Sequence, residues 1–334
     1  MPQPIPSTML RPWQEQLADL VTDPQELLAV LGLDAAQLDL VPAALQGFPL
    51  RVPRPYLARM EYGNPRDPLL LQVLPVGAEL LEVPGYVPDP LQEQAANTVP
   101  GLLHKYAGRV LLITTQSCAI HCRYCFRRHF PYADNRPGRE QWQQALDYIA
   151  ADASITEVIL SGGDPLATSN TYLGWLLQAL GDIPHLQRLR LHTRLPLMLP
   201  DRVDRPLLDL LAAWHGQVVV VLHANHAREF DYAVDAACQR LRGSGAHLLN
   251  QSVLLKGIND SVEALRELSE RLFVAGVLPY YLHQLDKVAG AAHFSVPDAA
   301  ALQLVAQLRE YLPGYLVPQL VRETAGDKAK LPLP

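Results

Sequence analysis

Three cysteines stand within eight residues in the first half of the 334-residue chain. Cys118, Cys122 and Cys125 lie in the segment QSCAIHCRYCF, separated by three residues and then by two. Three thiolates can hold three irons of a [4Fe–4S] cluster and leave the fourth iron without a protein ligand. Because a small molecule can then reach the open iron, this spacing predicts a reactive cluster.

Two other interpretations of the cysteines are a structural zinc site and unliganded thiols. Structural zinc normally has four protein ligands, and no fourth is obvious, although His121 and His129 are close. The remaining cysteine, Cys238, lies in a helical pattern, where a small buried apolar side chain is its expected role. The pattern therefore favours an iron–sulfur cluster on the three clustered cysteines.

A glycine-rich segment, SGGDP, spans residues 161–165 at the end of the next β-branched run. Taken alone, Gly162, Gly163 and Asp164 fit an ordinary strand-to-helix turn, with Pro165 near the first helical position. The position of this turn, at the end of the strand that follows the cysteines, makes it a candidate ligand-binding turn.

The elements that must position these residues alternate between strands and helices from Arg109 onward. Strands are predicted at 109–115, 156–162, 188–194, 217–225, 247–255 and 278–285. Helices are predicted between them at 138–152, 170–182, 204–216, 229–245 and 261–276, followed by a helix at 297–312 and a strand within 314–323. Such alternation predicts a parallel sheet with helices outside it.

Polar residues follow strand after strand in this series. The cysteines follow the first strand, Gly162–Asp164 the second, Arg194 the third, His223 and Asn225 the fourth, and Asp286 the sixth. Pattern alone does not separate a closed barrel from an open sheet, but functional residues of a barrel gather where its strands end. We therefore predict an α/β fold, a partial (βα)6-type TIM-like barrel.

The barrel is predicted to occupy only part of the chain, residues 105–322. Residues 1–104 read as an extension that is helical at 12–23 and 23–34 and then Pro-rich, without a clear period. Residues 323–334 read as a short C-terminal tail that carries lysines.

The composition excludes several classes of function. Apolar residues make up 49% and charged residues 19% of the chain, an ordinary globular balance. A formal net charge of -6 gives no global attraction to nucleic acid or anionic membranes. No apolar run approaches the ~20 residues of a membrane helix, and the start lacks a basic segment followed by an apolar one. We therefore expect a cytoplasmic protein that binds neither nucleic acid nor membrane.

The segments that carry these motifs resemble the radical S-adenosylmethionine superfamily and, within it, the lysine 2,3-aminomutase family. The resemblance covers roughly residues 100–334 and rests on LLHKYAGRVLLITTQSCAIHCRYCFRRHF, EVILSGGDPL, LHTRLPLMLP, LLNQSVLLKGIND, PYYLHQLD and VRETAGDKAKLP. It implies a [4Fe–4S] cluster, S-adenosylmethionine and pyridoxal 5′-phosphate as cofactors. Members of this family move the α-amino group of an amino acid to its β-carbon by radical chemistry.

The resemblance implies roles for three cations toward pyridoxal phosphate. Lys330, in GDKAKLP, matches the lysine that binds the cofactor covalently, and Lys328 is its close competitor. Both could instead be solvated lysines of the tail. Lys105 and Arg109 match positions that bind the cofactor phosphate, although each could be a surface cation.

Further roles follow from the same resemblance. Arg127 matches the arginine that pairs with the substrate carboxylate, a task that suits a guanidinium, and its neighbour Arg128 is the alternative. The SGGDP turn matches the element that meets the methionine amino group of S-adenosylmethionine. Tyr124 matches a position against the adenine and Gln251 a position near the ribose, while a buried tyrosine or a strand glutamine also has ordinary structural uses.

Two acids bear on substrate choice. Asp286, in YLHQLD, matches the acid that binds the distal ammonium of lysine, and Glu323 stands where lysine-degrading relatives carry a second acid, Asp. Two carboxylates at one end of a pocket attract a cationic side chain and repel glutamate. The resemblance therefore implies L-lysine as substrate, although each acid alone could be a surface charge.

The branch that this chain most resembles makes (R)-β-lysine for a ligase that attaches it to elongation factor P. The YCFRRHFPY segment and the Glu at position 323 carry that resemblance, and Cys238 has no downstream cysteine with which to form the zinc site of clostridial relatives. The expected partners are L-lysine, a reductant such as flavodoxin or ferredoxin, and indirectly the ligase and elongation factor P. A free-standing aminomutase for lysine or glutamate and a non-catalytic iron–sulfur protein are the alternatives.

Overall fold

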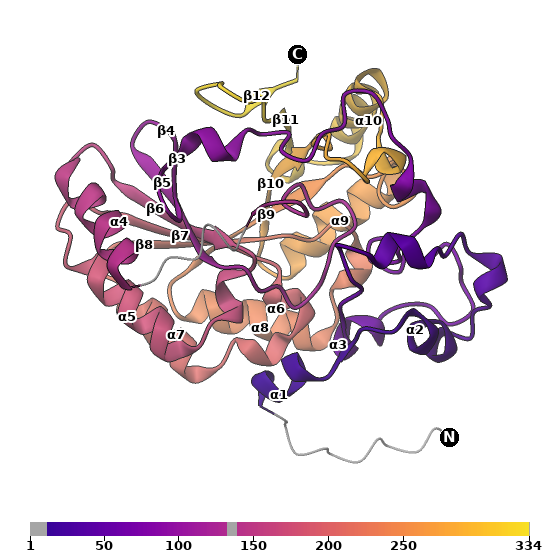
Figure 1. Ribbon diagram of the computed structural model, residues 1–334, viewed down its shortest axis with the longest axis horizontal. Helices are drawn as coiled ribbons and strands as arrows, with labels where there is room; N and C mark the ends of the chain where they lie inside the picture. Colours follow the sequence, from indigo (N-terminus) through magenta and orange to yellow (C-terminus); the bar gives the residue numbers. More distant parts are fainter. Residues whose placement is uncertain (1–11, 132–138, 334) are drawn as a thin grey trace.

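The computed structural model describes residues 12–131 and 139–333. Within these ranges one ten-stranded sheet forms the centre of the molecule (Figure 1). In spatial order its strands are β12 (Leu331–Pro332), β11 (Gln319–Arg322), β10 (Leu278–His283), β9 (His247–Val253), β8 (Gln217–Leu222), β7 (Arg188–Thr193), β6 (Glu157–Gly162), β5 (Arg109–Thr115), β4 (Leu102–Tyr106) and β3 (Asn97–Val99).

The sheet is mostly parallel and open. Strands β5 to β11 run parallel, whereas β3, β4 and β12 pair antiparallel with their neighbours. The strand order is linear, and no pairing among the described strands joins β3 to β12 and closes a barrel. The fold is therefore a partial TIM-like barrel, as the alternation of strands and helices predicted.

A helix fills each connection between successive parallel strands. These helices are α4 (Arg139–Ala151), α5 (Asn170–Gly181), α7 (Arg205–Ala212), α8 (Tyr232–Gly243), α9 (Val262–Val274) and α10 (Asp298–Tyr311), and a short α6 (Leu195–Met198) precedes α7. Figure 1 shows them packed along the outside of the sheet. All the predicted strands and helices of this series are confirmed, with differences at their ends.

Side-chain caps fix where four of these helices begin. Ser169, Asp204, Asp231 and Ser261 each accept a hydrogen bond from a backbone N–H three residues ahead in α5, α7, α8 and α9. Such caps satisfy N–H groups that have no partner within the helix. Because these helices begin at caps, the loops before them, which carry the candidate site residues, have defined lengths.

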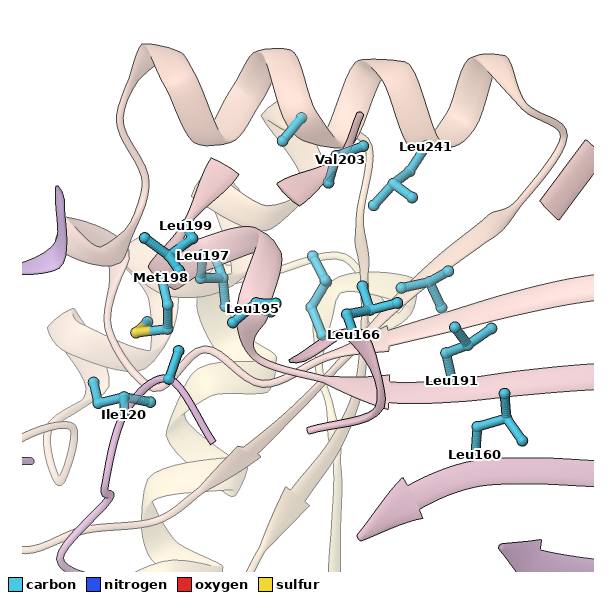
Figure 2. Close-up of a cluster of buried hydrophobic side chains, with 14 of the residues drawn as sticks. Ile120, Leu160, Leu166, Leu191, Leu195, Leu197, Met198, Leu199, Val203 and Leu241 are labelled. Atoms are coloured by element: carbon cyan, nitrogen blue, oxygen red, sulfur yellow. The ribbon is translucent and has the colours of Figure 1, made fainter. Parts of the chain in front are cut away.

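The sheet separates an apolar outer layer from a more polar inner face. Leu160 of β6 and Leu191 of β7 are fully buried, and Figure 2 shows them in a cluster with Leu241 of α8. Successive residues of a strand point to opposite faces of the sheet. The residues next to Leu160 in β6 and next to Leu191 in β7 therefore point to the inner face. The helices therefore cover one face and leave the other for a cavity.

The N-terminal extension packs onto the barrel through short elements: α1 (Trp13–Ala18), β1 (Leu20–Val21), α2 (Pro24–Leu31), β2 (Val52–Pro53) and α3 (Arg54–Leu57). Its apolar residues, such as Leu27 and Tyr56, belong to the same buried cluster as those of the barrel. Strand β4 lies across the proposed boundary at residue 104, and the division at 104 and 322 stays a prediction. None of the described helices is long and apolar enough to cross a membrane.

Candidate active site

One cavity of about 390 Å³ lies on the inner face of the sheet. Every residue singled out from the sequence as a site residue lines this cavity: Lys105, Arg109, Cys118, Cys122, Tyr124, Cys125, Arg127, Gly162, Gly163, Asp164, Gln251, Asp286, Glu323 and Lys330. The two alternatives do not line it, because Lys328 is exposed and Arg128 is ion-paired with Glu79 at 2.7 Å. The fold thus brings together residues that lie up to 225 positions apart in the chain, from Lys105 to Lys330.

The SGGDP turn holds the cysteine loop by close backbone contact. The N–H of Gly163 donates to Thr115 O at 2.6 Å, and that of Asp164 donates to Ser117 O at 2.8 Å. A Cβ at Gly163 would lie 2.4 Å from Ser117 O, and one at Gly162, whose φ is +117°, would lie 2.5 Å from Thr115 O. Only glycine fits at these two positions, so the turn sets the position of the loop that carries the cysteines.

The carboxylate of Asp164 ties the ends of neighbouring strands together. It accepts hydrogen bonds from Thr193 Oγ1 at 2.6 Å and from the backbone N–H groups of Leu166, Arg194 and Leu195. Asp164 is therefore engaged by the protein itself, on the wall of the cavity.

The three cysteines fit the donor set of an iron–sulfur cluster. None forms a disulfide, all three line the cavity from one loop, and Arg194 Nη1 lies 2.7 Å from Cys122 Sγ. Burial raises the pKa of the Cys125 thiol to about 12. Among the described residues no three His, Cys, Asp or Glu side chains converge on a single metal ion. Each thiolate of a [4Fe–4S] cluster binds a different iron, so such convergence is not needed.

A buried polar network lies behind the cysteine loop. The hydroxyl of Tyr124 contacts Arg194 Nη1 at 2.7 Å and Asn225 Nδ2 at 2.6 Å, and Arg194 is ion-paired with Glu229 at 2.9 Å. Gln72 Oε1, from the extension, accepts from Arg194 Nη2 at 2.6 Å. β8 ends at Leu222, earlier than the predicted strand end at 225, and Asn225 therefore lies in the loop that follows the strand.

Five charged side chains form a chain of ion pairs across the cavity. Lys330 Nζ lies 3.1 Å from Glu323 Oε2, and Glu323 Oε1 lies 3.1 Å from Lys105 Nζ. Lys105 Nζ lies 3.3 Å from Glu93 Oε1, and Glu93 binds Arg127 through two hydrogen bonds. Burial opposes the ionisation of Glu323, but the ammonium groups of Lys330 and Lys105 outweigh it and lower the pKa of Glu323 to about 2.

Asp286 differs from the other charged residues of the cavity. Burial and the nearby negative charge of Glu323 raise the pKa of Asp286 to about 7, against the opposing effect of Lys330. Within residues 12–131 and 139–333 its carboxylate has no hydrogen bond or ion pair. Asp286 is thus a carboxyl group on the cavity wall that a cationic ligand would stabilise in its ionised form.

Three histidines form a neutral part of the wall. Burial is the main cause that lowers the pKa values of His192 and His283, and it lowers the pKa of His223 to about 3. His283 Nε2 lies 3.4 Å from Lys330 Nζ, while the buried Nε2 atoms of His192 and His223 lack a hydrogen-bond partner within the described residues. His192 and His223 thus contribute unpaired buried nitrogens to the wall of the cavity.

Sequence reasoning missed Glu93, His192 and His283 as cavity residues. The two histidines could have been found from strand alternation, since His192 follows Arg190 by two positions on β7 and both line the cavity. Glu93 stands in the Pro-rich stretch, where no period indicated a structure. The roles assigned to the individual residues stay predictions.

Comparisons with known proteins found the following similarities. A family described as a 4Fe-4S single cluster domain matches residues 107–182. The chain is 51% identical over 322 residues to the L-lysine 2,3-aminomutase of Escherichia coli (strain K12), covering 96% of this chain and 94% of that protein. It is 34% identical to the enzyme of the same name from Clostridium subterminale, covering 96% of this chain and 77% of that protein. Among solved structures, a radical SAM methyltransferase from Sphaerobacter thermophilus has a TM-score of 0.45 at 22% identity, covering 67% of this chain and 71% of that one.

Proposed function

Since the chain belongs to the lysine 2,3-aminomutase family of radical S-adenosylmethionine enzymes, we propose that it converts L-α-lysine to (R)-β-lysine. The observation that carries this proposal is that one cavity holds both a cationic side chain and a group of acidic side chains. Arg127 lies at the cysteine loop, and Asp286 lies with Glu323 near Lys330. A zwitterionic amino acid with a second ammonium group matches this distribution of charge.

The cofactors are those of the family: a [4Fe–4S] cluster, S-adenosylmethionine and pyridoxal phosphate. Together they supply a radical that abstracts hydrogen and an aromatic ring that spreads an unpaired electron. Cys118, Cys122 and Cys125 would hold the cluster, and the SGGDP turn, Tyr124 and Gln251 would hold S-adenosylmethionine.

Lys330, Lys105 and Arg109 would hold pyridoxal phosphate. Lys330 Nζ stands between Glu323 Oε2 at 3.1 Å and His283 Nε2 at 3.4 Å. The pKa of His283 is lowered mainly by burial, so its neutral ring can accept a hydrogen bond from the Lys330 ammonium but is too weak a base to remove its proton. A deprotonated lysine is the form that can bond to the cofactor.

The substrate is held at both ends. Arg127 would bind the α-carboxylate, and Asp286 with Glu323 would bind the distal ammonium. The reacting carbons would then lie inside the cavity, between these two groups of side chains.

Glutamate is the amino acid that best tests whether the cavity prefers lysine. Purified, reconstituted protein incubated with each amino acid should form the β-amino acid from lysine at least about a hundred times faster, since a carboxylate beside Asp286 and Glu323 is repelled. Equal rates would favour the alternative of a less selective aminomutase and contradict the roles of these two acids.

The setting of the reaction is also proposed from the resemblance. The product would serve a ligase that attaches β-lysine to elongation factor P, and a cytoplasmic flavodoxin or ferredoxin would supply the electron. Mass spectrometry of elongation factor P from cells with and without this protein tests the link. A β-lysyl group that persists without the protein would contradict it.

A further inference from the structure

Arg127 is ion-paired with the carboxylate of Glu93. Arg127 Nε donates to Glu93 Oε2 at 2.6 Å, and Arg127 Nη2 donates to Glu93 Oε1 at 2.8 Å. Two parallel hydrogen bonds of this kind fix the plane of a guanidinium as well as its position. Glu93 therefore determines how Arg127 is oriented.

The opposite side of the guanidinium meets the SGGDP turn. Arg127 Nη1 donates to Ser161 Oγ at 3.1 Å and to Gly162 O at 3.3 Å. The side chain of Arg127 is 6% exposed and that of Glu93 is 5% exposed, so the pair is shielded from water. A shielded ion pair with good geometry is costly to break, because one buried charge would be left alone.

Glu93 is itself anchored by the segment that carries it. Its N–H donates to Asp89 Oδ1 at 3.1 Å. Upstream, Val87 N donates to Lys287 O at 2.9 Å, and Ala289 N donates to Val87 O at 3.0 Å. The segment 87–93 therefore runs from the residues beside Asp286 to Arg127, that is, from one end of the proposed substrate to the other.

The charges around Glu93 leave room for one carboxylate. Burial opposes the ionisation of Glu93, but Arg127 and Lys105 outweigh it and lower the pKa of Glu93. The chain of ion pairs from Lys330 to Arg127 holds three cations and two anions, so its net charge is about +1, which one ligand carboxylate neutralises. Since Glu93 is bound to two cations and a backbone anchor, a ligand would join this group rather than displace Glu93.

We infer that Glu93 is a positioning residue that aligns Arg127 for the α-carboxylate and so makes the cavity select amino acids over amines that lack a carboxylate. This inference rests on the proposed function, in which Arg127 binds that carboxylate. In a Glu93→Gln variant the amide NH2 would face a guanidinium N–H, donor against donor. One of the two parallel hydrogen bonds is lost, and the guanidinium turns out of its plane.

The test compares L-lysine with cadaverine, which has the same distal ammonium but no carboxylate. Dissociation constants are measured by calorimetry on protein reconstituted with the cluster, pyridoxal phosphate and S-adenosylmethionine, for the wild type, Glu93→Gln and the exposed control Glu82→Gln. We expect Glu93→Gln to weaken L-lysine binding at least about tenfold and cadaverine binding less than about twofold. The control should match the wild type for both ligands.

If Glu93→Gln binds L-lysine as tightly as the wild type does, Glu93 is dispensable. If the variant binds L-lysine more tightly, Glu93 competes with the substrate. Either result overturns the inference. A wild type that does not prefer L-lysine to cadaverine overturns instead the proposed role of Arg127. If Glu93→Gln does not fold, Glu93→Asp keeps the charge but is one methylene too short to reach both nitrogens. L-lysine affinity at the wild-type value in that variant likewise overturns the inference.

Discussion

Lys330 and Lys328 are separated by one alanine, yet only Lys330 lines the cavity. The sequence alone did not separate them, because the tail offers no period that would orient a side chain. Their separation comes from β12, which pairs with β11 and turns Lys330 toward Glu323 and His283. One strand pairing thus decides which lysine can hold a cofactor.

Replacing Lys330 with alanine tests this assignment. We expect turnover to fall at least about a thousandfold, because the amine that bonds to pyridoxal phosphate is removed. The visible absorbance of the cluster should stay at the wild-type level. The matched control is Lys328→Ala, whose side chain is exposed. Loss of turnover in the control alone would reverse the assignment.

The raised pKa of Asp286 predicts a pH dependence of substrate binding. Below pH of about 7 the empty protein holds Asp286 protonated, and a neutral carboxyl offers no charge to the lysine ammonium. L-lysine should therefore bind about tenfold more weakly at pH 6 than at pH 8. Asp286→Asn should bind L-lysine weakly at both pH values. If the affinity of Asp286→Asn for L-lysine falls between pH 8 and pH 6 as much as that of the wild type does, another group causes the pH dependence.

The same pKa predicts the direction of a stability change. The folded-state pKa of about 7 lies above the usual value for aspartate, so the folded protein binds an extra proton between pH of about 4 and 7. The contribution of Asp286 to stability is thus present at low pH and lost as pH rises through 7. Asp286→Asn should raise the Tm of the ligand-free protein at pH 8 and change it little at pH 4. A lowered Tm at pH 8 would contradict this account.

At the scale of elements, the parts of the chain with a clear period of apolar residues were predictable from the sequence. The parts without such a period were not. Strands and helices from β5 to β10 were found because short apolar runs alternate there with helical patterns. The Pro-rich stretch before β3 was not, because its shape depends on distant contacts. Arg123, for example, donates to Phe48 O and Ala44 O at 2.7 and 2.9 Å, and no local pattern encodes such contacts.

The contact between the SGGDP turn and the cysteine loop gives a prediction at this scale. Gly163→Ala would place a methyl group 2.4 Å from the backbone oxygen of Ser117, so the loop must shift. We expect the variant to incorporate less than about half of the wild-type iron and sulfide, because the three thiolates are no longer placed for the cluster. Gly243→Ala, with nothing within 4 Å of its Cβ, is the control. Full iron content in the Gly163 variant would show that the turn does not position the cysteines.

At the scale of the whole molecule, the extension supports the site that the barrel carries. Arg123, between two cluster cysteines, is fully buried and ion-paired with Glu79 of the extension at 2.5 Å. The backbone of the cysteine loop also bonds to the extension, through His121 N to Arg51 O and Arg123 N to Gln72 O. The extension therefore holds both the backbone of the cysteine loop and the buried arginine within it.

A fragment that begins at Asn97 should consequently not fold on its own. The fragment lacks Ala44, Phe48 and Glu79, to which the Arg123 side chain is bonded, and it lacks the apolar residues of the extension that share the buried cluster of the barrel. We expect no cooperative thermal transition by circular dichroism. A fragment that unfolds cooperatively and binds iron would establish the barrel as an independent domain.

In the proposed function, one cavity holds the cluster, both organic cofactors and lysine. Anaerobically reconstituted protein should be incubated with L-lysine, S-adenosylmethionine, pyridoxal phosphate and a reductant, and the products separated by chromatography. We expect β-lysine to form, and only when all components are present. Cleavage of S-adenosylmethionine without any β-lysine would contradict the substrate assignment, and the absence of both would contradict the assignment of the cavity as a whole.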